Sequence, residues 1–398
     1  MHAPDLPGDS VADRLKAARK LKGVTQLQLA QRANFSASLV KKVEQGSKPP
    51  SAAFVAGAAR VLGIRVATLY GTRTSEVLDE PSRESAGVAE LRSALDAYDD
   101  PRPEGNPLTL DAITARLAVI SEKAQALRNA DMLAELPNLL HHLYVLVGQP
   151  GRAGELARAA LHDAYRMSAT AAGQFRQADI AAIASERHIQ LAPATGDPLR
   201  VAISAYHRST RCLQHGDYRN GLRLLDRARQ HVADGPDDRA VAIQLDLRSA
   251  VLAARAGDTT EADGYLSEAR AFSEEFAPPA APYYNVDASS TNIVVHWCAA
   301  PVENYNGAEA VRRASTVTVV DPRRPERVGH HHIDMARAWM LHGDRGRTLD
   351  ELNAARRVAP NVTRHHPSVA ETVHALAMSE RRTTDSLAGF AQWAGIQL

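Results

Sequence analysis

The stretch from Val24 to Gly46 has the pattern of two short helices joined by a tight turn. Thr25 is a good N-cap, because its hydroxyl can accept a hydrogen bond from a free N–H of the first helical turn. Asn34 tolerates the left-handed conformation that the turn needs, and Ser36 can cap a second helix. Apolar residues fall where two steeply crossing helices would face each other: Leu29, Ala30, Ala33, Phe35, Val40 and Val43. The stretch therefore predicts a helix-turn-helix unit with its second helix presented outward.

Further landmarks extend this pattern along most of residues 11–71: Arg19, Thr25-Gln26, Leu29-Ala30, Val40, Val43-Glu44, Gly46 and Pro50-Ser51. With these landmarks the segment resembles the Xre-type helix-turn-helix domain of phage repressors and many bacterial regulators. The resemblance implies a five-helix, lambda-repressor-like DNA-binding domain over residues 1–71. Its helices are expected at about 11–22, 25–33, 36–45, 51–62 and 66–70.

The resemblance, together with the basic charge of the segment, indicates which residues contact DNA. The candidates are Thr25, Gln26, Ser36, Ala37, Ser38, Leu39, Lys41, Lys42 and Lys48. Gln26 matches a position that contacts the DNA backbone. The residues that match groove-facing positions of the recognition helix are Ser36, Ala37, Ser38 and Lys42. Small side chains at Ala37 and Ser38 leave direct readout to thymine methyl contacts and to Lys42, which prefers guanine O6 and N7. The target sequence is therefore not predictable.

Several of these residues have alternative roles. Ser36 can act as a helix cap alone, the two lysines of the recognition helix can form an ordinary solvated face, and Leu39 can pack in a dimer contact. Arg19 and Glu44 match a structural ion pair that ties the first helix of the domain to the third. We therefore expect this pair to be scaffold.

Charge supports the DNA-binding interpretation independently. Residues 1–71 contain eleven basic and four acidic residues, a net charge of +7, whereas the rest of the chain carries −6. Six of the seven lysines lie in this first segment. Basic side chains gathered at one end favour binding to a phosphate backbone through counterion release.

The 398 residues leave room for a second, larger core after residue 71. A polar segment with a proline, residues 72–87, is expected to be a linker. A helix at 88–98 should follow, and the segment 99–107 should interrupt the helices. Amphipathic helices are then predicted at 109–129, 131–147, 151–171, 174–191, 197–215, 218–232, 237–256, 260–276, 285–300, 306–316, 328–342, 345–358, 367–380 and 383–395.

An internal repeat accompanies these helices. A turn glycine is followed by small residues five and twelve positions later: Gly148, Ala153, Ala160; Gly216, Gly221, Ala228; Gly257, Ala262, Ala269; and Gly343, Thr348, Ala355. The two small residues lie two helical turns apart, on one face, where they would let a neighbouring helix approach. A further turn is expected at Tyr305-Asn306-Gly307. This pattern resembles a degenerate tetratricopeptide repeat, which implies an α-solenoid over residues 88–398.

An Xre-type domain followed by such repeats is similar to a group of actinobacterial regulators, and in plan to peptide-sensing regulators of the RRNPP type. A solenoid leaves a concave surface, lined by the first helix of each pair, that can hold a small molecule or a peptide. Candidate ligand-binding residues there are His207 with Arg211 and Asn292 with His296. A solvated face or an inter-helix hydrogen bond is the alternative for each.

Other chemistries find little support in the sequence. The glycines form no phosphate-binding loop, and the sequence contains no nucleophile elbow or metalloprotease motif, so we expect no enzyme and no cofactor. The histidine runs lack carboxylate or cysteine partners at ligand spacing, so no metal site is expected. Cys212 and Cys298 are expected to be buried free thiols. No membrane span or signal peptide is recognised, which indicates a cytoplasmic protein.

The sequence therefore predicts an all-α, homodimeric transcriptional regulator. It would bind double-stranded DNA, with a palindromic operator as the expected target, and respond to a small-molecule or peptide signal in its helical-repeat domain. In one alternative, the repeats are a scaffold gated by a protein partner. In another, the first domain has lost DNA binding and serves as a dimerisation module.

Overall fold

The computed structural model describes residues 8, 10–71, 83–125, 129–175, 177–275, 284, 286–319, 321, 324–379 and 385–397. Its described part is helical throughout, with no strand. The first five helices form the helix-turn-helix domain: α1 Val11–Leu21, α2 Gln26–Ala33, α3 Ala37–Glu44, α4 Ala52–Leu62 and α5 Val66–Tyr70. These bounds agree with the expected ones to within one residue at each end.

Local sequence chemistry accounts for these helix ends. Thr25 and Gln28 form a capping box at the start of α2, in which each side chain bonds the other residue's backbone N–H. Asn34 ends α2 in the left-handed conformation, with φ 60°, and the chain then turns into α3. The core of the domain is built from the apolar faces of all five helices and includes Leu15, Leu29, Val40, Phe54 and Leu69.

The rest of the chain forms the helical-repeat domain (α6–α22). Its helices are α6 Arg83–Asp96, α7 Leu110–Gln125, α8 Asn129–Leu133, α9 Leu136–Val147, α10 Arg152–Gln174, α11 Ala178–Leu191, η1 Ala192–Thr195, α12 Pro198–His215, α13 Tyr218–Arg229, α14 Pro236–Ala256, α15 Thr259–Glu275, α16 Ser290–Glu303, α17 Gly307–Ala314, α18 Pro325–His342, α19 Arg345–Val358, α20 Pro360–His365, α21 Pro367–Ser379 and α22 Asp385–Ala394.

Four details of this domain differ from the sequence expectations. Helix α6 begins at Arg83, so it takes in the last residues of the expected linker, whose residues 72–82 lie outside the described part. The expected helices 109–129 and 131–147 are divided differently, with a separate short α8 between them. Helix α16 begins at Ser290 because Ser289 caps it, and α20 was not expected.

Consecutive helices pack as pairs, namely α10 with α11, α12 with α13, α14 with α15, α16 with α17 and α18 with α19. First helices also contact one another, since α14 packs against both α12 and α16, and α16 against α18. This is the tetratricopeptide-like α-solenoid that the repeat predicted. At Gly221 a Cβ would lie 2.7 Å from Leu252 Cδ2, so glycine is needed there for α13 to approach α14.

One repeat departs from the expected register. Ala153 is exposed, whereas Ala160 is buried as expected, and the first turns of α10 bury Gly154 and Ala157 instead of Ala153. The left-handed turn residue before α10 is Gly151, with φ 68°, whereas Gly148 has an ordinary right-handed conformation. The turn is therefore three residues later than expected, which shifts the buried face of the first turns of α10.

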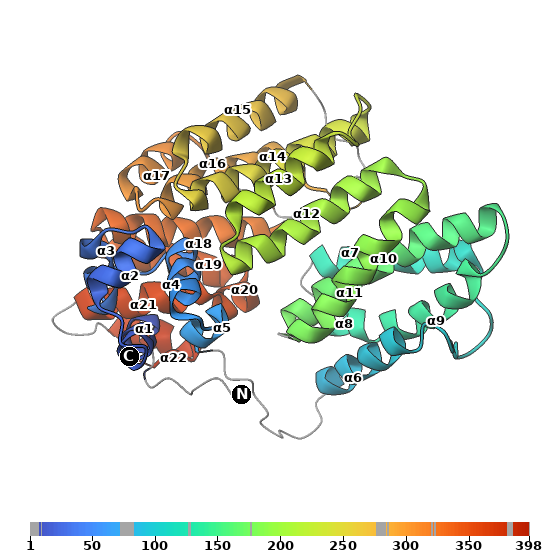
Figure 1. The fold of residues 1–398 in the computed structure, drawn as a ribbon, viewed down its shortest axis with the longest axis horizontal. Coiled ribbons are helices and arrows are strands. Elements are labelled where there is room, and N and C mark those ends of the chain that lie inside the picture. Colours follow the sequence, from blue (N-terminus) through green and yellow to red (C-terminus); the bar gives the residue numbers. More distant parts are fainter. Residues whose placement is uncertain are drawn as a thin grey trace.

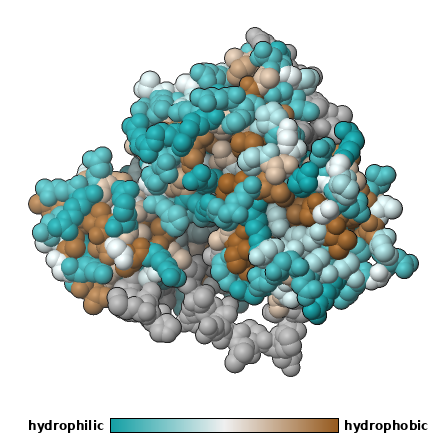
Figure 2. Space-filling view, turned by 45° about the vertical axis from the view of Figure 1, so that its right-hand side comes forward, coloured by the Kyte–Doolittle hydropathy of each residue, from teal (hydrophilic) through white to brown (hydrophobic). Residues whose placement is uncertain are grey.

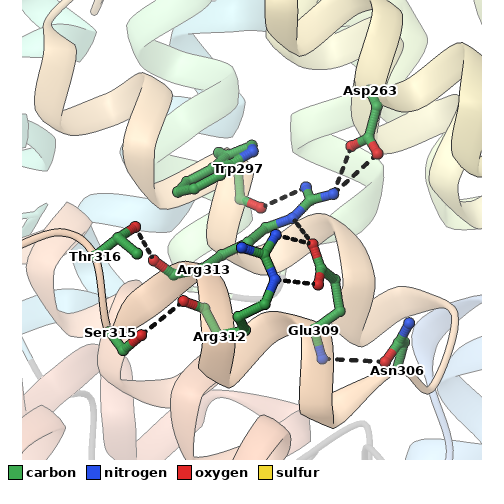
Figure 3. A network of polar contacts seen from close by, with 8 residues as sticks. All are labelled: Asp263, Trp297, Asn306, Glu309, Arg312, Arg313, Ser315 and Thr316. Carbon is green, nitrogen blue, oxygen red and sulfur yellow. Dashed lines mark hydrogen bonds and ion pairs between the residues drawn. The ribbon is translucent and has the colours of Figure 1, made fainter.

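A polar network fixes α17 in the stack (Figure 3). Arg313 Nη2 lies 2.9 Å from both carboxylate oxygens of Asp263 on α15, and Arg313 Nη1 donates to the Trp297 carbonyl of α16 at 3.1 Å. Asn306 caps α17 by accepting from the Glu309 backbone N–H. The turn that begins at Tyr305 is thus held by the Asn306 cap at the start of α17 and by the contacts of Arg313 with α15 and α16.

The helix-turn-helix domain lies beside the last helices of the chain. In Figure 1, α1–α5 neighbour α18 and α21 at one end of the molecule, while α6–α9 lie at the other end. Helix α4 also contacts α12 and α14. Figure 2 shows hydrophilic side chains over most of the visible face, as expected for amphipathic helices that pack their apolar sides inward. Among the described residues, none of the helices is long and apolar enough to cross a membrane.

Candidate nucleic-acid interface

Helix α3 presents one face to solvent and buries the other. Ser36 caps it by accepting a hydrogen bond from the Leu39 backbone N–H at 3.1 Å, yet Ser36 is itself exposed. The first turn of the helix, Ala37 and Ser38, is exposed, as are Lys41 and Lys42 one turn further. The exposed face therefore combines small side chains at the helix N-terminus, where backbone N–H groups attract phosphate, with two cations.

The opposite face of α3 belongs to the domain core. Val40, Val43 and Glu44 are buried, and Leu39 is half-buried against the core. Leu39 is thus mainly a packing residue within its own domain. Leu27, which lies on the exposed side of α2, remains 57% exposed.

The Arg19–Glu44 ion pair is present and ties α1 to α3. Arg19 Nε lies 2.5 Å from Glu44 Oε1, and Arg19 Nη2 donates to Glu44 Oε2 at 2.9 Å. The hydrogen bonds that Arg19 donates to this carboxylate raise the pKa of Arg19. Gln26 also donates to Glu44 Oε2, at 2.7 Å, so its side chain is engaged within the domain and must exchange that partner to reach a phosphate.

Lys48 follows α3 and differs from the other candidate DNA contacts in touching the helical-repeat domain. Its ammonium group sits 4.4 Å from the ring centroid of Tyr305, which belongs to the turn between α16 and α17. Burial and the nearby charge of Lys42 lower the pKa of Lys48. Thr25, by contrast, is exposed at the start of α2. The structure therefore brings eight of the nine candidates to α2 and α3 and leaves Lys48 in contact with the helical-repeat domain.

Tyr305 is the central residue of a contact between the two domains. Its hydroxyl accepts a hydrogen bond from the Ser51 backbone N–H at 2.7 Å, and its ring packs against the core of the helix-turn-helix domain. Burial raises the pKa of Tyr305 to about 12, so the hydroxyl stays protonated. Ser51 caps α4 with its side chain, and its own N–H donates to Tyr305, its acceptor among the described residues.

Two more hydrogen bonds join the domains. Glu371 of α21 accepts from the Val11 backbone N–H, the first residue of α1, at 3.3 Å. Arg60 Nη1 of α4 donates to the Gly216 carbonyl at 3.2 Å, in the turn between α12 and α13. The contact therefore involves α1, α4 and the segment before α4. It leaves the exposed face of α3 uncovered.

The four candidate ligand-binding residues are distributed over two places. His207 is half-buried on α12, while Arg211 pairs with Glu186 of α11 at 3.1 Å. Asn292 is fully buried and donates to the Asp287 carbonyl, and His296 bonds the Asn292 carbonyl at 2.8 Å. Arg211 thus makes the inter-helix contact that the sequence left open as an alternative, and Asn292 bonds the backbone just before its own helix.

Comparison with known proteins agrees with the geometry of the first domain. A family model described as a helix-turn-helix domain matches residues 10–69. The immunity repressor protein of Bacillus phage phi105 is 32% identical over 111 residues, which cover 26% of this chain and 77% of that protein. This chain belongs to the Xre-type helix-turn-helix family of transcriptional regulators.

This helix-turn-helix regulator is similar to a second protein over the same domain. The uncharacterized HTH-type transcriptional regulator YazB of Bacillus subtilis strain 168 is 45% identical over 51 residues, which cover 13% of the regulator and 74% of YazB. A solved structure of a PrgX mutant aligns with 96% of the regulator and 100% of its own chain, at 11% identity and a TM-score of 0.26. As a member of its family, the regulator binds DNA and controls transcription.

Sequence patterns did not identify the residues that join the two domains. Tyr305 was recognised only as part of a turn, and Glu371 was not singled out. A contact between residues 254 positions apart, such as Ser51 and Tyr305, leaves no local periodicity that could predict it. The positive φ of Tyr305, 59°, is the one local sign of its special position, and it is visible only in the structure.

Proposed function

We propose that the regulator is a homodimer that places the exposed face of α3 in the major groove of each half-site of an operator. Its helical-repeat domain receives a small-molecule or peptide signal that changes operator affinity. The observation that carries the proposal is the exposed, basic face of α3 on a domain that docks on the helical repeats through Tyr305. One helix-turn-helix reads one half-site, so two copies are needed for a full operator.

The docked arrangement supports a direct route for the signal. The helix-turn-helix domain touches the repeats at the turn after α12, at the turn after α16 and on α21. A ligand that changes how the first helices stack would move these contact points relative to one another. The ligand shifts operator occupancy only if it binds one arrangement of the two domains better than the other.

A protein partner is the second candidate for the signal. Repeats of this kind also act as interaction scaffolds, and a partner on the same surface would change the same interdomain contacts. Titration of the full chain with the low-molecular-mass fraction of a cell extract separates these candidates. Heat of binding supports a diffusible ligand, and its absence supports the scaffold.

Recovery of bound DNA across a genome, followed by fluorescence anisotropy with the recovered operator, tests the proposal. We expect preferential binding of the operator over random DNA at moderate salt. We also expect Tyr305→Ala to change operator affinity by at least about threefold, or about 0.7 kcal/mol, because it releases Lys48 and frees Ser51 from the repeats. Equal operator affinity of the variant and the unaltered chain would contradict control through this contact.

A further inference from the structure

Six side chains meet on the inner helices of the helical-repeat domain, and we call them the arginine–histidine cluster: Arg166, His188, Tyr206, His207, Arg248 and Tyr284. They come from α10, α11, α12 and α14 and from the segment before α16. His207 lies at the centre, because its ring packs edge-on against the rings of His188, at 5.4 Å, and of Tyr206, at 5.2 Å. Both arginines are close enough to His207 to act on it electrostatically.

The two arginines bond aromatic and hydroxyl groups rather than carboxylates among the described residues. Arg248 donates to the Tyr206 hydroxyl at 2.7 Å and to Thr210 Oγ1 at 3.3 Å. Arg166 stacks over the Tyr284 ring at 5.4 Å, and its buried Nε has no hydrogen-bond partner among the described residues. Neither guanidinium forms an ion pair within the part of the chain that the structure describes.

The acidic residues near the cluster are paired elsewhere. Asp163 lies 3.4 Å from Arg200, and the buried Asp287 lies 3.5 Å from Arg324 and 3.8 Å from Arg327. The sequence of residues 276–285, which surrounds Tyr284, contains no aspartate or glutamate. Asp163 also attracts Arg166 electrostatically, although its ion pair is with Arg200. Among the described residues, Arg248 has no carboxylate at ion-pair distance, so the cluster keeps positive charge available for a ligand.

The histidines do not add to this charge at neutral pH. Burial, more than the nearby arginines, lowers the pKa of His188 to about 4 and holds that of His207 well below its ordinary range. Both rings are thus neutral and present a flat apolar face, although His188 Nδ1 is already hydrogen-bonded to the His162 carbonyl at 3.0 Å. Together with Tyr206 and Tyr284 they give the cluster an aromatic wall beside two cations.

Half-buried guanidinium groups without an ion pair cost free energy, because the charge has lost part of its water and no carboxylate binds it directly. We infer that the arginine–histidine cluster is the binding site for an anionic ligand, whose carboxylate or phosphate lies beside His207 between Arg166 and Arg248. The flat apolar body of the ligand packs against the aromatic rings. This inference rests on the proposed function, since it specifies the chemistry of the signal.

Guanidinium groups suit this role because they bind carboxylate and phosphate through paired, charge-assisted hydrogen bonds. The acid group can belong to a small aromatic acid or to the C-terminal carboxylate of a peptide. A neutral molecule of the same shape would leave both cations without a partner. The cluster is therefore expected to require a negative charge on the ligand, and to prefer a ligand whose body is planar.

Binding of 1-anilinonaphthalene-8-sulfonate, a fluorescent aromatic anion, to the full chain tests the inference. We expect saturable binding that weakens at least about tenfold in Arg166→Gln/Arg248→Gln, the size expected for losing charge-assisted contacts. Arg345→Gln is the matched control, since Arg345 is exposed on α19, and its affinity should stay within about twofold. Absence of saturable binding, or equal affinity in the double variant, overturns the inference.

Competition experiments on the unaltered chain provide a second measurement, which does not depend on the variant folding. Benzoate should displace the probe, and benzyl alcohol at the same concentration should not; equal displacement by both overturns the inference. A short peptide with an aromatic C-terminal residue is compared with its C-terminal amide. Displacement by the free acid alone identifies a peptide carboxylate as a source of the anion, and displacement by benzoate alone identifies a small acid.

Operator affinity measured with and without the probe separates this inference from the proposed function. If the probe binds at the cluster but operator affinity is unchanged, the anion site stands and the cluster does not carry the signal. If operator affinity responds to a ligand but the double variant responds equally, the signal-receiving role stands and the anion site is wrong.

Discussion

The Tyr305 hydroxyl accepts a hydrogen bond from the Ser51 backbone N–H at 2.7 Å, and this bond joins the helix-turn-helix domain to the helical repeats. Ser51 is 2% exposed, so no solvent replaces Tyr305 if its hydroxyl is removed. The position of the DNA-binding domain therefore depends on the turn between α16 and α17. The Arg313 network shown in Figure 3 holds α17, and with it this turn, against the neighbouring helices.

Tyr305→Phe should weaken this contact while keeping the ring that packs against the domain core. We expect a loss of about 1–3 kcal/mol in the free energy of unfolding, because the buried Ser51 N–H loses its acceptor. Chemical denaturation followed by circular dichroism measures the loss. Tyr98→Phe is the matched control, since Tyr98 is 57% exposed, and its stability should be unchanged. Equal effects of the two substitutions would count against the role of the hydroxyl.

Glu371 should make the interdomain contact sensitive to pH. Burial raises the pKa of Glu371 from 4.5 to about 7, and the negative charge of Asp13 raises it further. The hydrogen bond from the Val11 N–H and the positive charge of Arg14 lower the pKa, but by less. The folded chain therefore holds this proton more tightly than the unfolded chain. The stability that this provides is present below about pH 4.5 and is lost as the pH rises through about 7.

Glu371→Gln should remove this dependence, because glutamine keeps an acceptor for the Val11 N–H and carries no charge. At about pH 8 we expect the variant to be more stable than the unaltered chain by roughly 1–3 kcal/mol, and at about pH 4 to be within about 0.5 kcal/mol of it. Denaturation at both pH values measures the difference. A constant difference between the two proteins across this range would show that folding does not raise the pKa of Glu371.

The Arg19–Glu44 pair should support the domain more than an exposed ion pair would. The Glu44 side chain is 2% exposed, so Arg19→Ala leaves a buried carboxylate with Gln26 as its remaining side-chain donor. We expect a loss of about 2–4 kcal/mol in unfolding free energy. Arg270→Ala, which removes an exposed pair with Glu274, should cost less than about 0.5 kcal/mol. Losses of the same size for both would contradict the scaffold role of Arg19.

Gly221 should be required by the packing of α13 against α14. An added Cβ would lie 2.7 Å from Leu252 Cδ2 and 3.2 Å from Cys212 Cβ, both in a buried region, so Gly221→Ala should destabilise the chain by about 1–3 kcal/mol. Gly264→Ala on α15 meets nothing within 4 Å and should be neutral or stabilising. Thermal unfolding of the two variants distinguishes them, and a stabilising Gly221→Ala would mean that the helices are less closely packed.

Local chemistry made the helix-turn-helix predictable. The cap at Thr25, the left-handed turn at Asn34 and the cap at Ser36 are each encoded within a few residues, so the bounds of α2 and α3 followed from sequence. The turn glycines Gly216 and Gly257 likewise marked the ends of α12 and α14. Both have positive φ, a conformation that glycine adopts without strain.

Contacts between distant parts of the chain were not predictable in the same way. Lys48 was expected on the DNA side because of its charge, but Tyr305, which reaches it from another domain, gives it a different partner. Arg166 and Arg248 were not singled out because an arginine on an amphipathic helix is ordinary. Only the packing of α10, α12 and α14 shows that neither side chain forms an ion pair within the described part of the chain.

The salt dependence of operator binding, compared between the unaltered chain and Lys41→Ala/Lys42→Ala, tests the central claim most directly. Both lysines lie on the exposed face of α3, and each phosphate contact contributes about −0.9 to the slope of log affinity against log salt. We predict weaker binding and a slope that is shallower by about 2 in the double variant, with no change for Lys123→Ala in the helical repeats. Unchanged operator affinity and slope in the double variant would contradict the assignment of α3 as the DNA-reading helix.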